Sequence, residues 1–314
     1  MPELPEVETI RRGLNRLIVG KTIARARHCD SPKSFPNDPT TVAHFLHNAR
    51  VTAVRRRAKV LFIELNTCYT LVVHLKMTGQ LVFVGAERWG GGHPTDSLIH
   101  ELPDRHTRVI IDFTDGTRLF FNDLRKFGWM KLYPTAEVPD IPFMRRVGPE
   151  PLGDSCGSAA FISRIRRRNN TTVKAAVLDQ SVIAGVGNIY ADESLWQARI
   201  HPAMRVHALS DAQLTVLLTI IKKVLALGIE MGGSTDKNYV DAEGNKGNYL
   251  QFAHVFRREG QPCQRHPDST IQKIRVAGRG THICPACQVL PPEYADDEKL
   301  SRLCMQRGAL NGKR

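Results

Sequence analysis

The N-terminal segment MPELPEVETIRRGLNRL has the hydrophobic spacing of an amphipathic helix. Its apolar side chains recur every three or four positions, at Val7, Ile10, Leu14 and Leu17. This spacing places them on one helical face, and Pro5 stands near the first turn, where a helix tolerates proline. The pattern predicts a helix that begins almost at the first residue.

From about residue 50 the pattern changes to short runs rich in β-branched and aromatic residues: KVLFIEL, YTLVVHL, TRVIIDF and TRLFF. Asp115-Gly116 separates the last two runs and is a hairpin signal. The segment GAERWGGGHPTDSLIHELPD is rich in glycine and polar residues, which predicts a long loop between strands. This half is expected to form a β-sandwich or barrel with one leading helix.

The second half has a helical pattern over residues 158–231. Its clearest helix begins at a capping box of Ser210 and Gln213 and ends before Gly232-Gly233. The predicted organisation is a β-rich domain, a proline-dense linker, a helical domain, a β-hairpin unit and a tail without predicted structure or role. These parts span residues 1–133, 134–150, 151–249, 250–288 and 289–314.

The charge balance indicates a polyanionic partner. The chain has 44 Lys and Arg against 31 Asp and Glu, a formal net charge of +13. Nucleic-acid-binding proteins have such a charge, and so do some ribosome-associated, membrane-surface and other basic proteins. The 42% hydrophobic content excludes a chain that is disordered throughout. Because no apolar run reaches about 18 residues and no signal peptide is recognisable, the protein is expected in the cytoplasm, without a membrane partner.

Cysteine spacing predicts a metal site near the C-terminal end. The motifs CQRH and CPAC supply two ligand pairs, each with two residues between its members: Cys263, His266, Cys284 and Cys287. Three thiolates and one imidazole fit a structural zinc ion in tetrahedral coordination. The alternative is a hairpin that stands without zinc. Between the pairs, IQKIRV and THIC are expected to form strands, with Arg279 at the turn.

Two further motifs offer chemistry. Removal of Met1 would expose Pro2 as a secondary amine that can attack a sugar carbon, with Glu3 and Glu6 beside it for proton transfer. The alternative is that Pro5 and these acids only favour the start of a helix. In AGVGNIYADE, a glycine turn before a helix and the amide of Asn188 offer donors to a phosphate, although glycine pairs mostly mark turns.

Five segments in order resemble the motifs of formamidopyrimidine-DNA glycosylases: MPELPEVE, HLKMTGQL, NDLRKFG, AGVGNIYADE and AGRGTHICPAC. The resemblance spans residues 1–288. It implies an α+β multidomain fold with an N-terminal β-sandwich and leading helix. The C-terminal part would hold a helical helix-two-turns-helix domain and a β-hairpin zinc finger. The implied activity is a DNA glycosylase with AP lyase activity that acts on damaged double-stranded DNA, here as a monomer in the cytoplasm, or on the nucleoid of a bacterium.

The resemblance also implies roles for residues at matching positions. Pro2 matches the Schiff-base nucleophile, Glu3 the acid that acts at the deoxyribose, Glu6 a supporting acid and Lys59 a lysine near the lesion. Seven residues match contacts with DNA. Met77, Arg125 and Phe127 match residues that fill the gap left by the everted nucleotide, Asn188 and Arg279 match phosphate contacts, and Lys237 and Tyr239 fall in the loop over the flipped base.

Two departures and two rivals stay open. His266 stands where the family has a cysteine, with one extra residue before the second pair, and nothing in the resemblance explains residues 289–314. An endonuclease VIII-like enzyme for oxidised pyrimidines shares the nucleophile. Leu4 and the set of Met77, Arg125 and Phe127 favour oxidised purines instead, as substrates of a β,δ-eliminating enzyme. A zinc-containing DNA-binding protein without catalysis is the rival from another class.

Overall fold

The structure, a computed structural model, describes residues 1–29, 32–234 and 248–294. The chain falls into two units. The first comprises Met1–Arg146 with Leu227–Leu250, and the second comprises Val147–Ala226 with Gln251–Arg314. The domain boundaries expected from the sequence stay a prediction, and each unit is described by itself below.

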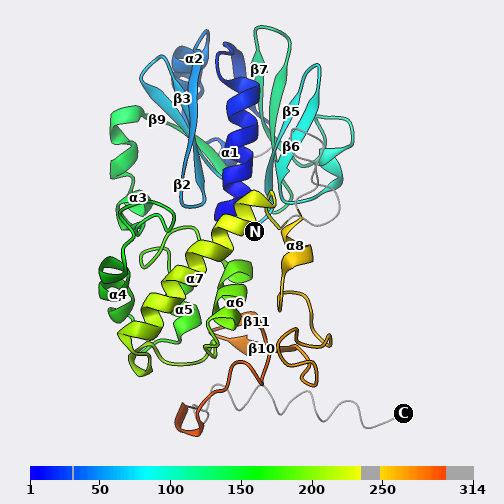
Figure 1. The fold of residues 1–314 in the computed structure, drawn as a ribbon. Helices are drawn as coiled ribbons and strands as arrows, with labels where there is room; N and C mark the ends of the chain where they lie inside the picture. The colour runs from blue at the N-terminus through cyan, green and yellow to red at the C-terminus, as the bar shows by residue number, and fades with distance from the viewer. Residues whose placement is uncertain (30–31, 235–247, 295–314) are drawn as a thin grey trace. The chain divides into compact units, whose positions relative to one another are not determined.

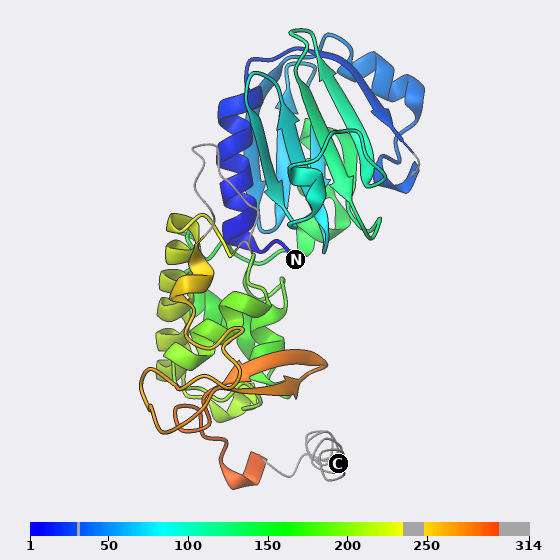
Figure 2. The same ribbon diagram turned by 90° about the vertical axis from the view of Figure 1, so that its right-hand side faces the viewer.

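The first unit is a two-layered β-sandwich, visible in Figure 1 and Figure 2. One layer is an antiparallel sheet in the order β1-β7-β8-β5-β6, and the other is an antiparallel sheet in the order β2-β3-β4-β9. Apolar side chains of both sheets meet in one buried core. The strands are β1 (Ile23–His28), β2 (Val51–Arg57), β3 (Val60–Leu65), β4 (Tyr69–His74), β5 (Gly79–Val84), β6 (Arg88–Gly92), β7 (Thr107–Phe113), β8 (Arg118–Asp123) and β9 (Trp129–Pro134).

Helix α1 (Leu4–Ile18) packs against the edge strands β2 and β6, one from each sheet (Figure 1). Its apolar face is buried, which confirms the predicted leading helix. Close packing on β6 depends on Gly13, because a Cβ there would lie 2.2 Å from the Trp89 ring. The remaining helical segments of this unit are η1 (Pro32–Ser34), α2 (Pro39–Leu46), η2 (Asp96–Leu98), η3 (Thr135–Asp140) and α3 (Pro142–Arg146).

The predicted long loop over residues 85–104 is wrong in part. It contains strand β6, which pairs with β5, and the short helix η2. Three consecutive glycines, residues 90–92, obscure the strand in the sequence because they carry no alternation. Two of them are required: a Cβ on Gly90 would lie 2.5 Å from the Leu98 side chain, and Gly92 has a φ of +123°, which disfavours other residues. The buried Trp89 then anchors the strand.

The proline-dense segment 134–143 forms η3 and the start of α3. Ile141 of this segment and Met144, which follows it in α3, pack with Val60, Phe62 and Val72 in a second apolar cluster of the first unit. The segment therefore packs against the rest of the first unit.

The second unit is helical, with a terminal β-hairpin. The capping box at the start of α7 is present as predicted: the Ser210 N–H donates to Gln213 Oε1 at 2.8 Å, and the Gln213 N–H donates to Ser210 Oγ at 3.2 Å. Helix α7 continues into the first unit at residue 227. The elements of this half of the chain are α4 (Ser158–Arg166), α5 (Val173–Leu178), α6 (Asn188–Gln197), η4 (Val206–Ala208), α7 (Asp211–Glu230), α8 (Tyr249–Phe252), β10 (Gln272–Val276), β11 (Arg279–Ile283) and η5 (Pro292–Tyr294). Like α7, α8 has residues in both units.

Among the described helices, α7 alone is long and apolar enough to cross a membrane by length and composition. Its apolar residues Leu214, Leu217, Ile221 and Leu225 recur at helical spacing and are buried. A core helix has this pattern, so the length of α7 alone does not make it a membrane span.

Candidate active site and DNA-binding surface

The N-terminus is tied closely to helix α1. Glu3 is the N-cap residue, and its backbone N–H donates to Glu6 Oε2 at 2.8 Å within a capping box. The other oxygen, Glu6 Oε1, accepts hydrogen bonds from the Ser234 N–H at 2.7 Å and from the Ser234 hydroxyl at 2.8 Å. Pro2, Glu3 and Glu6 are all buried. Glu6 thus fixes the residue next to Pro2 and also holds the segment that follows α7.

His93, which was not identified from the sequence, lies near the N-terminal amine. Burial and the positive charge of the N-terminal amine lower its pKa, against the opposing effect of the Asp123 carboxylate. His93 follows β6, and a strand hidden among glycines gave no signal that this histidine would approach the N-terminus.

Lys59 lies in the turn between β2 and β3 and is almost completely buried. The preceding Ala58 has a φ of +53°. Its carbonyl accepts a hydrogen bond from Arg56 Nη1 at 2.9 Å, and Arg56 Nε in turn donates to Glu8 Oε2 at 3.1 Å. These two hydrogen bonds link α1 to the turn and fix the backbone next to Lys59.

A neutral histidine supports the neighbouring loop. Burial, with the charges of Lys76 and Lys59, lowers the pKa of His74 to about 3. His74 Nδ1 therefore stays free to accept a hydrogen bond from the Lys76 N–H, at 3.1 Å. Lys76 immediately precedes Met77.

Met77, Arg125 and Phe127, which the matching motifs assign to one set, lie together in the first unit. Arg125 Nη1 is 3.1 Å from Met77 Sδ, and the guanidinium lies 4.7 Å from the centre of the Phe127 ring. Phe127 is 53% exposed and Met77 is 40% exposed. Two apolar side chains held in solvent around an arginine suit insertion into a base stack.

Asn188 and Arg279 meet in the second unit. Asn188 is the first residue of α6, and its Nδ2 donates to the carbonyl of Gly280 at 3.0 Å. Arg279 precedes that glycine at the start of β11 and is exposed. A helix N-terminus, an amide and a guanidinium therefore lie within two adjoining elements, an arrangement suited to a phosphate.

A buried network of charged side chains lies next to Asn188 and Arg279, and it was not predicted from the sequence. Lys174 Nζ is 2.6 Å from Asp192 Oδ1 and 2.6 Å from Thr281 Oγ1, and all three side chains are buried. Asp192 Oδ2 also accepts the His282 N–H at 2.9 Å. The network joins α5, α6 and β11. The only signal in the sequence is one lysine in the otherwise apolar run VKAAVL.

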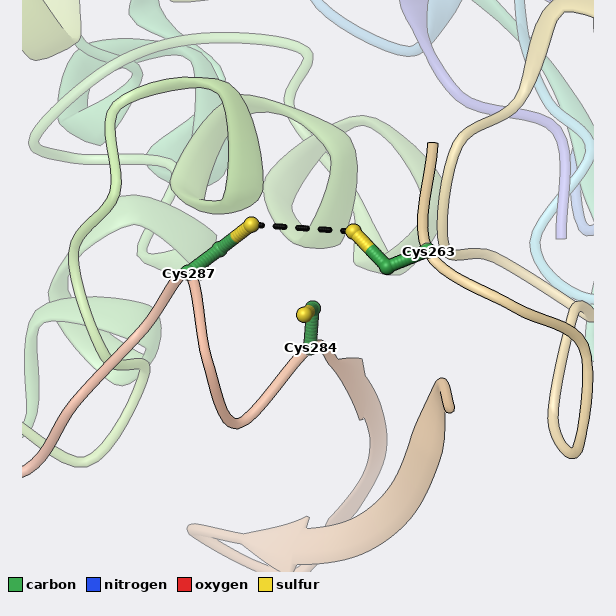
Figure 3. A group of neighbouring side chains, drawn as sticks. All are labelled: Cys263, Cys284 and Cys287. Carbon is green, nitrogen blue, oxygen red and sulfur yellow. Dashed lines mark hydrogen bonds between the residues drawn. The ribbon is translucent and has the colours of Figure 1, made fainter. Parts of the chain in front are cut away.

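Three cysteines converge in the hairpin unit, as Figure 3 shows. The Sγ atoms of Cys263, Cys284 and Cys287 lie within 4.8 Å of one another, and Cys263 and Cys287 are 3.6 Å apart. Zn–S bonds of about 2.3 Å in a tetrahedron place sulfurs about 3.8 Å apart, so the cluster fits zinc. A structural zinc on this hairpin would supply cross-linking of the chain and no redox chemistry.

His266 is not in that cluster of described residues, and its side chain is exposed. The backbone of His266, and not its imidazole, interacts with Cys263 of this cluster. Burial raises the pKa of Cys263, but hydrogen bonds from the backbone of His266 and Arg265 and from the thiols of Cys284 and Cys287 lower it to about 7. Burial and the two other sulfurs raise the pKa of Cys287 to about 12. The imidazole as fourth ligand stays a prediction. Lys237 and Tyr239 lie outside the described residues.

Comparison with known proteins agrees with this architecture. Three family models match consecutive parts of the chain: the formamidopyrimidine-DNA glycosylase N-terminal domain over residues 1–130, the H2TH domain of the same enzyme over 147–239, and the zinc finger found in FPG and IleRS over 260–289. The H2TH match confirms the predicted helix-two-turns-helix domain, and the zinc-finger match with the thiol cluster assigns a structural zinc.

Curated relatives and solved structures cover nearly the whole chain. The formamidopyrimidine-DNA glycosylases of Herpetosiphon aurantiacus and Ligilactobacillus salivarius are 42% and 39% identical. Each match covers 92% of this chain, with 100% and 99% of the relative. A Lactococcus lactis FPG variant in complex with Fapy-dG-containing DNA aligns with a TM-score of 0.81 at 31% identity. The Lactococcus lactis enzyme non-covalently bound to AP-site-containing DNA aligns with 0.78 at 30%, and both cover 92% of this chain and 100% of their own. The chain therefore belongs to the formamidopyrimidine-DNA glycosylase family and is a DNA glycosylase of base excision repair with AP lyase activity.

Proposed function

We propose that the protein removes oxidised purines, 8-oxoguanine and formamidopyrimidines, from damaged double-stranded DNA through a Schiff base on Pro2, followed by β,δ-elimination. The observation that carries this proposal is the position of the buried Pro2 at the start of α1, next to the buried Glu3 and near the buried Glu6. A secondary amine fixed beside proton-transfer groups is the arrangement that covalent catalysis at a sugar carbon requires.

The chemistry follows from the nitrogen of Pro2 once Met1 has been removed. The nitrogen lone pair attacks C1′, the glycosidic bond breaks, and the modified base leaves with its bonding electrons. Glu3 assists opening of the sugar ring, which gives an iminium between Pro2 and C1′. The iminium acidifies the C2′ protons, so β-elimination breaks the 3′ C–O bond and δ-elimination then breaks the 5′ C–O bond.

The remaining residues act on the DNA. Met77, Arg125 and Phe127 fill the gap left by the everted nucleotide, which offsets the cost of unstacking it. Lys59 approaches the lesion and the adjacent phosphate. Asn188 and Arg279 hold the backbone through phosphates, while the zinc hairpin supports the turn that carries Arg279.

The purine preference rests on Leu4 and on the set of Met77, Arg125 and Phe127. Relatives of known structure are described with Fapy-dG-containing DNA, which supports the same preference. We further propose that the protein acts as a monomer in the cytoplasm.

Borohydride reduction tests the nucleophile, because it converts an iminium into a stable covalent adduct. On a duplex with 8-oxoguanine we expect a trapped complex whose adduct maps to the N-terminal peptide by mass spectrometry. A preparation that retains Met1 should form none, since its Pro2 nitrogen is locked in an amide. Lys59→Ala is the matched control, and it should still trap at Pro2.

An adduct found only on an internal lysine would overturn the assignment of Pro2. Absence of any adduct with full DNA affinity would favour a non-catalytic binder. A panel of defined lesions separates the substrate classes: faster excision of oxidised pyrimidines than of oxidised purines would favour an endonuclease VIII-like activity.

A further inference from the structure

Two loops carry Met77, Arg125 and Phe127, and the fold places these loops side by side. Asp123, the last residue of β8, is the register partner of Gly79, the first residue of β5. The chain enters β5 through Met77 and Thr78, and it leaves β8 toward Arg125 and Phe127. The two loops therefore start from one pair of adjacent strand ends.

The side chain of Asp123 is fully buried between these loops, at 0% exposure. Its Oδ1 accepts hydrogen bonds from the Thr78 hydroxyl and, at 3.2 Å, from the Arg125 N–H. Its Oδ2 accepts the Gly128 N–H at 2.6 Å. Thr78 Oγ1 also accepts the Arg125 N–H, at 3.0 Å. The Thr78–Asp123 pair thus bonds to both ends of the loop that contains Phe127, and joins it to the loop that contains Met77.

Hydrogen bonds also fix the backbone of Asp123. The Nε of the buried Arg108 donates to the Asp123 carbonyl at 2.9 Å, and the Asp123 N–H donates to the carbonyl of His106 at 2.8 Å. At Gly128, a Cβ would lie 2.8 Å from the Phe121 ring and 3.1 Å from the Asp123 carboxylate. The carboxylate therefore occupies one fixed position, with room for a backbone N–H and for little else.

Both loops hold a lysine in the left-handed region directly before an exposed apolar side chain. Lys76, with a φ of 52°, precedes Met77, and Lys126, with a φ of 58°, precedes Phe127. A non-glycine residue adopts this conformation only at a cost, so the surrounding hydrogen bonds must maintain it. The Thr78–Asp123 pair supplies those bonds for the loop of Lys126.

We propose that Thr78 and Asp123 are positioning residues that set Met77, Arg125 and Phe127 in the arrangement required to replace an everted nucleotide. The proposal rests on the proposed function, because that function assigns the three side chains to the gap in the DNA. Neither Thr78 nor Asp123 needs to contact DNA. They act by reducing the freedom that the inserting side chains would otherwise lose on binding.

A conservative variant isolates this role. Thr78→Val removes the hydroxyl while it keeps the shape of the side chain, and Thr78→Ser restores the hydroxyl. Thr70→Val is the matched control in the same unit. Thr70 is also buried, and its hydroxyl bonds to the Thr135 hydroxyl at 2.9 Å, on the other sheet and away from both loops.

Three measurements on each variant decide the matter: single-turnover excision of 8-oxoguanine, fluorescence of a 2-aminopurine beside the lesion as a reporter of unstacking, and cleavage at a preformed abasic site. For Thr78→Val we expect excision and the fluorescence rise to slow by about tenfold, since the buried hydrogen bond from Thr78 to the Asp123 side chain is lost. Cleavage at the abasic site, which has no base to evert, should stay within about twofold of wild type. Thr78→Ser and Thr70→Val should match wild type in all three measurements.

Excision by Thr78→Val at the wild-type rate would overturn the proposal. An equal loss in all three measurements would also overturn it, because the pair would then only stabilise the fold. Failure of the proposed function is seen separately, in the wild-type protein: without excision and without a trapped adduct on Pro2, the enzymatic assignment fails before any Thr78 variant is considered.

Discussion

At the scale of single residues, Arg125 can offer only hydrogen-bond donors. Its guanidinium is held near Met77 and over Phe127, so it is placed before DNA arrives. Eversion of a damaged guanine leaves its partner base without hydrogen bonds. Cytosine presents two adjacent acceptors, O2 and N3, which suit this donor array. Adenine presents one acceptor beside an amino donor, which an arginine N–H opposes.

We therefore expect faster excision of 8-oxoguanine opposite cytosine than opposite adenine. One good polar contact corresponds to about 1 to 3 kcal/mol, or roughly 5- to 150-fold in rate. Arg125→Ala should reduce this ratio, because the donor array is lost. Phe127→Ala is the control, and it should slow both reactions because it removes the stacking ring. Single-turnover rates on the two duplexes measure the effect, and an unchanged ratio in Arg125→Ala would contradict the assigned role.

At the scale of elements, the hairpin unit brings together three of the four zinc ligands predicted from the sequence. Three buried thiols form the cluster, while the fourth predicted ligand, His266, presents its backbone to Cys263. Zinc bound by thiolates and imidazole contributes folding energy to such small units. The purified protein should therefore carry one zinc per chain.

Substitutions in this hairpin test the fourth ligand. His266→Ala should lower zinc content and DNA affinity together, whereas His266→Cys should preserve both, because a thiolate replaces the imidazole. Cys284→Ser, within the cluster, gives the reference for complete loss of the site. Metal analysis and binding titrations provide the measurements. Full zinc content in His266→Ala would exclude the imidazole as ligand, and a zinc-free native protein with full activity would show that the hairpin stands without metal.

The elements that the sequence predicted correctly are those whose patterns are local. The periodicity of Val7, Ile10 and Leu14 marks α1, and Asp115-Gly116 marks the hairpin of β7 and β8. Strand β6 was missed because its identity depends on a distant contact, the packing of Trp89 on Gly13 of α1. A glycine run has no alternation of its own, so only that contact distinguishes it from a loop.

The same difference between local patterns and distant contacts applies to the candidate site. Residues inside recognisable motifs, such as Pro2 and Arg125, were proposed as site residues from the sequence, whereas the residues that hold them in place were not. Thr78 and Asp123 are 45 positions apart and meet only because β5 pairs with β8. Lys174 and Asp192 meet only through the packing of α5 on α6. Sequence spacing cannot show that a buried charge has a partner from another element.

At the scale of the whole molecule, the net charge of +13 gives an attraction to DNA that does not depend on sequence. Some of the basic side chains are paired within the protein. Arg16 bonds to Glu87, Arg166 to Asp211 and Arg168 to Asp179, so these guanidinium groups are partly neutralised. The net charge of +13 already subtracts these acidic partners, so it does not give the number of phosphates that the protein neutralises. The dependence of binding on salt measures that number directly.

Arg279 and Asn188 should differ in that dependence, although both are proposed to contact phosphates. A cation on a phosphate releases a condensed counterion, so each such contact contributes about −0.9 to the slope of log K against log salt. A neutral amide releases none. Arg279→Ala should weaken binding on all sequences alike and flatten the slope by about 1. Asn188→Ala should weaken binding with little change in slope.

Titrations of an undamaged duplex across a range of salt concentrations test the predicted difference between Arg279 and Asn188. An unchanged slope in Arg279→Ala would remove that residue from the phosphate contacts. An equal flattening in both variants would show that Asn188 acts through its hydrogen bond to Gly280, by holding Arg279 in place.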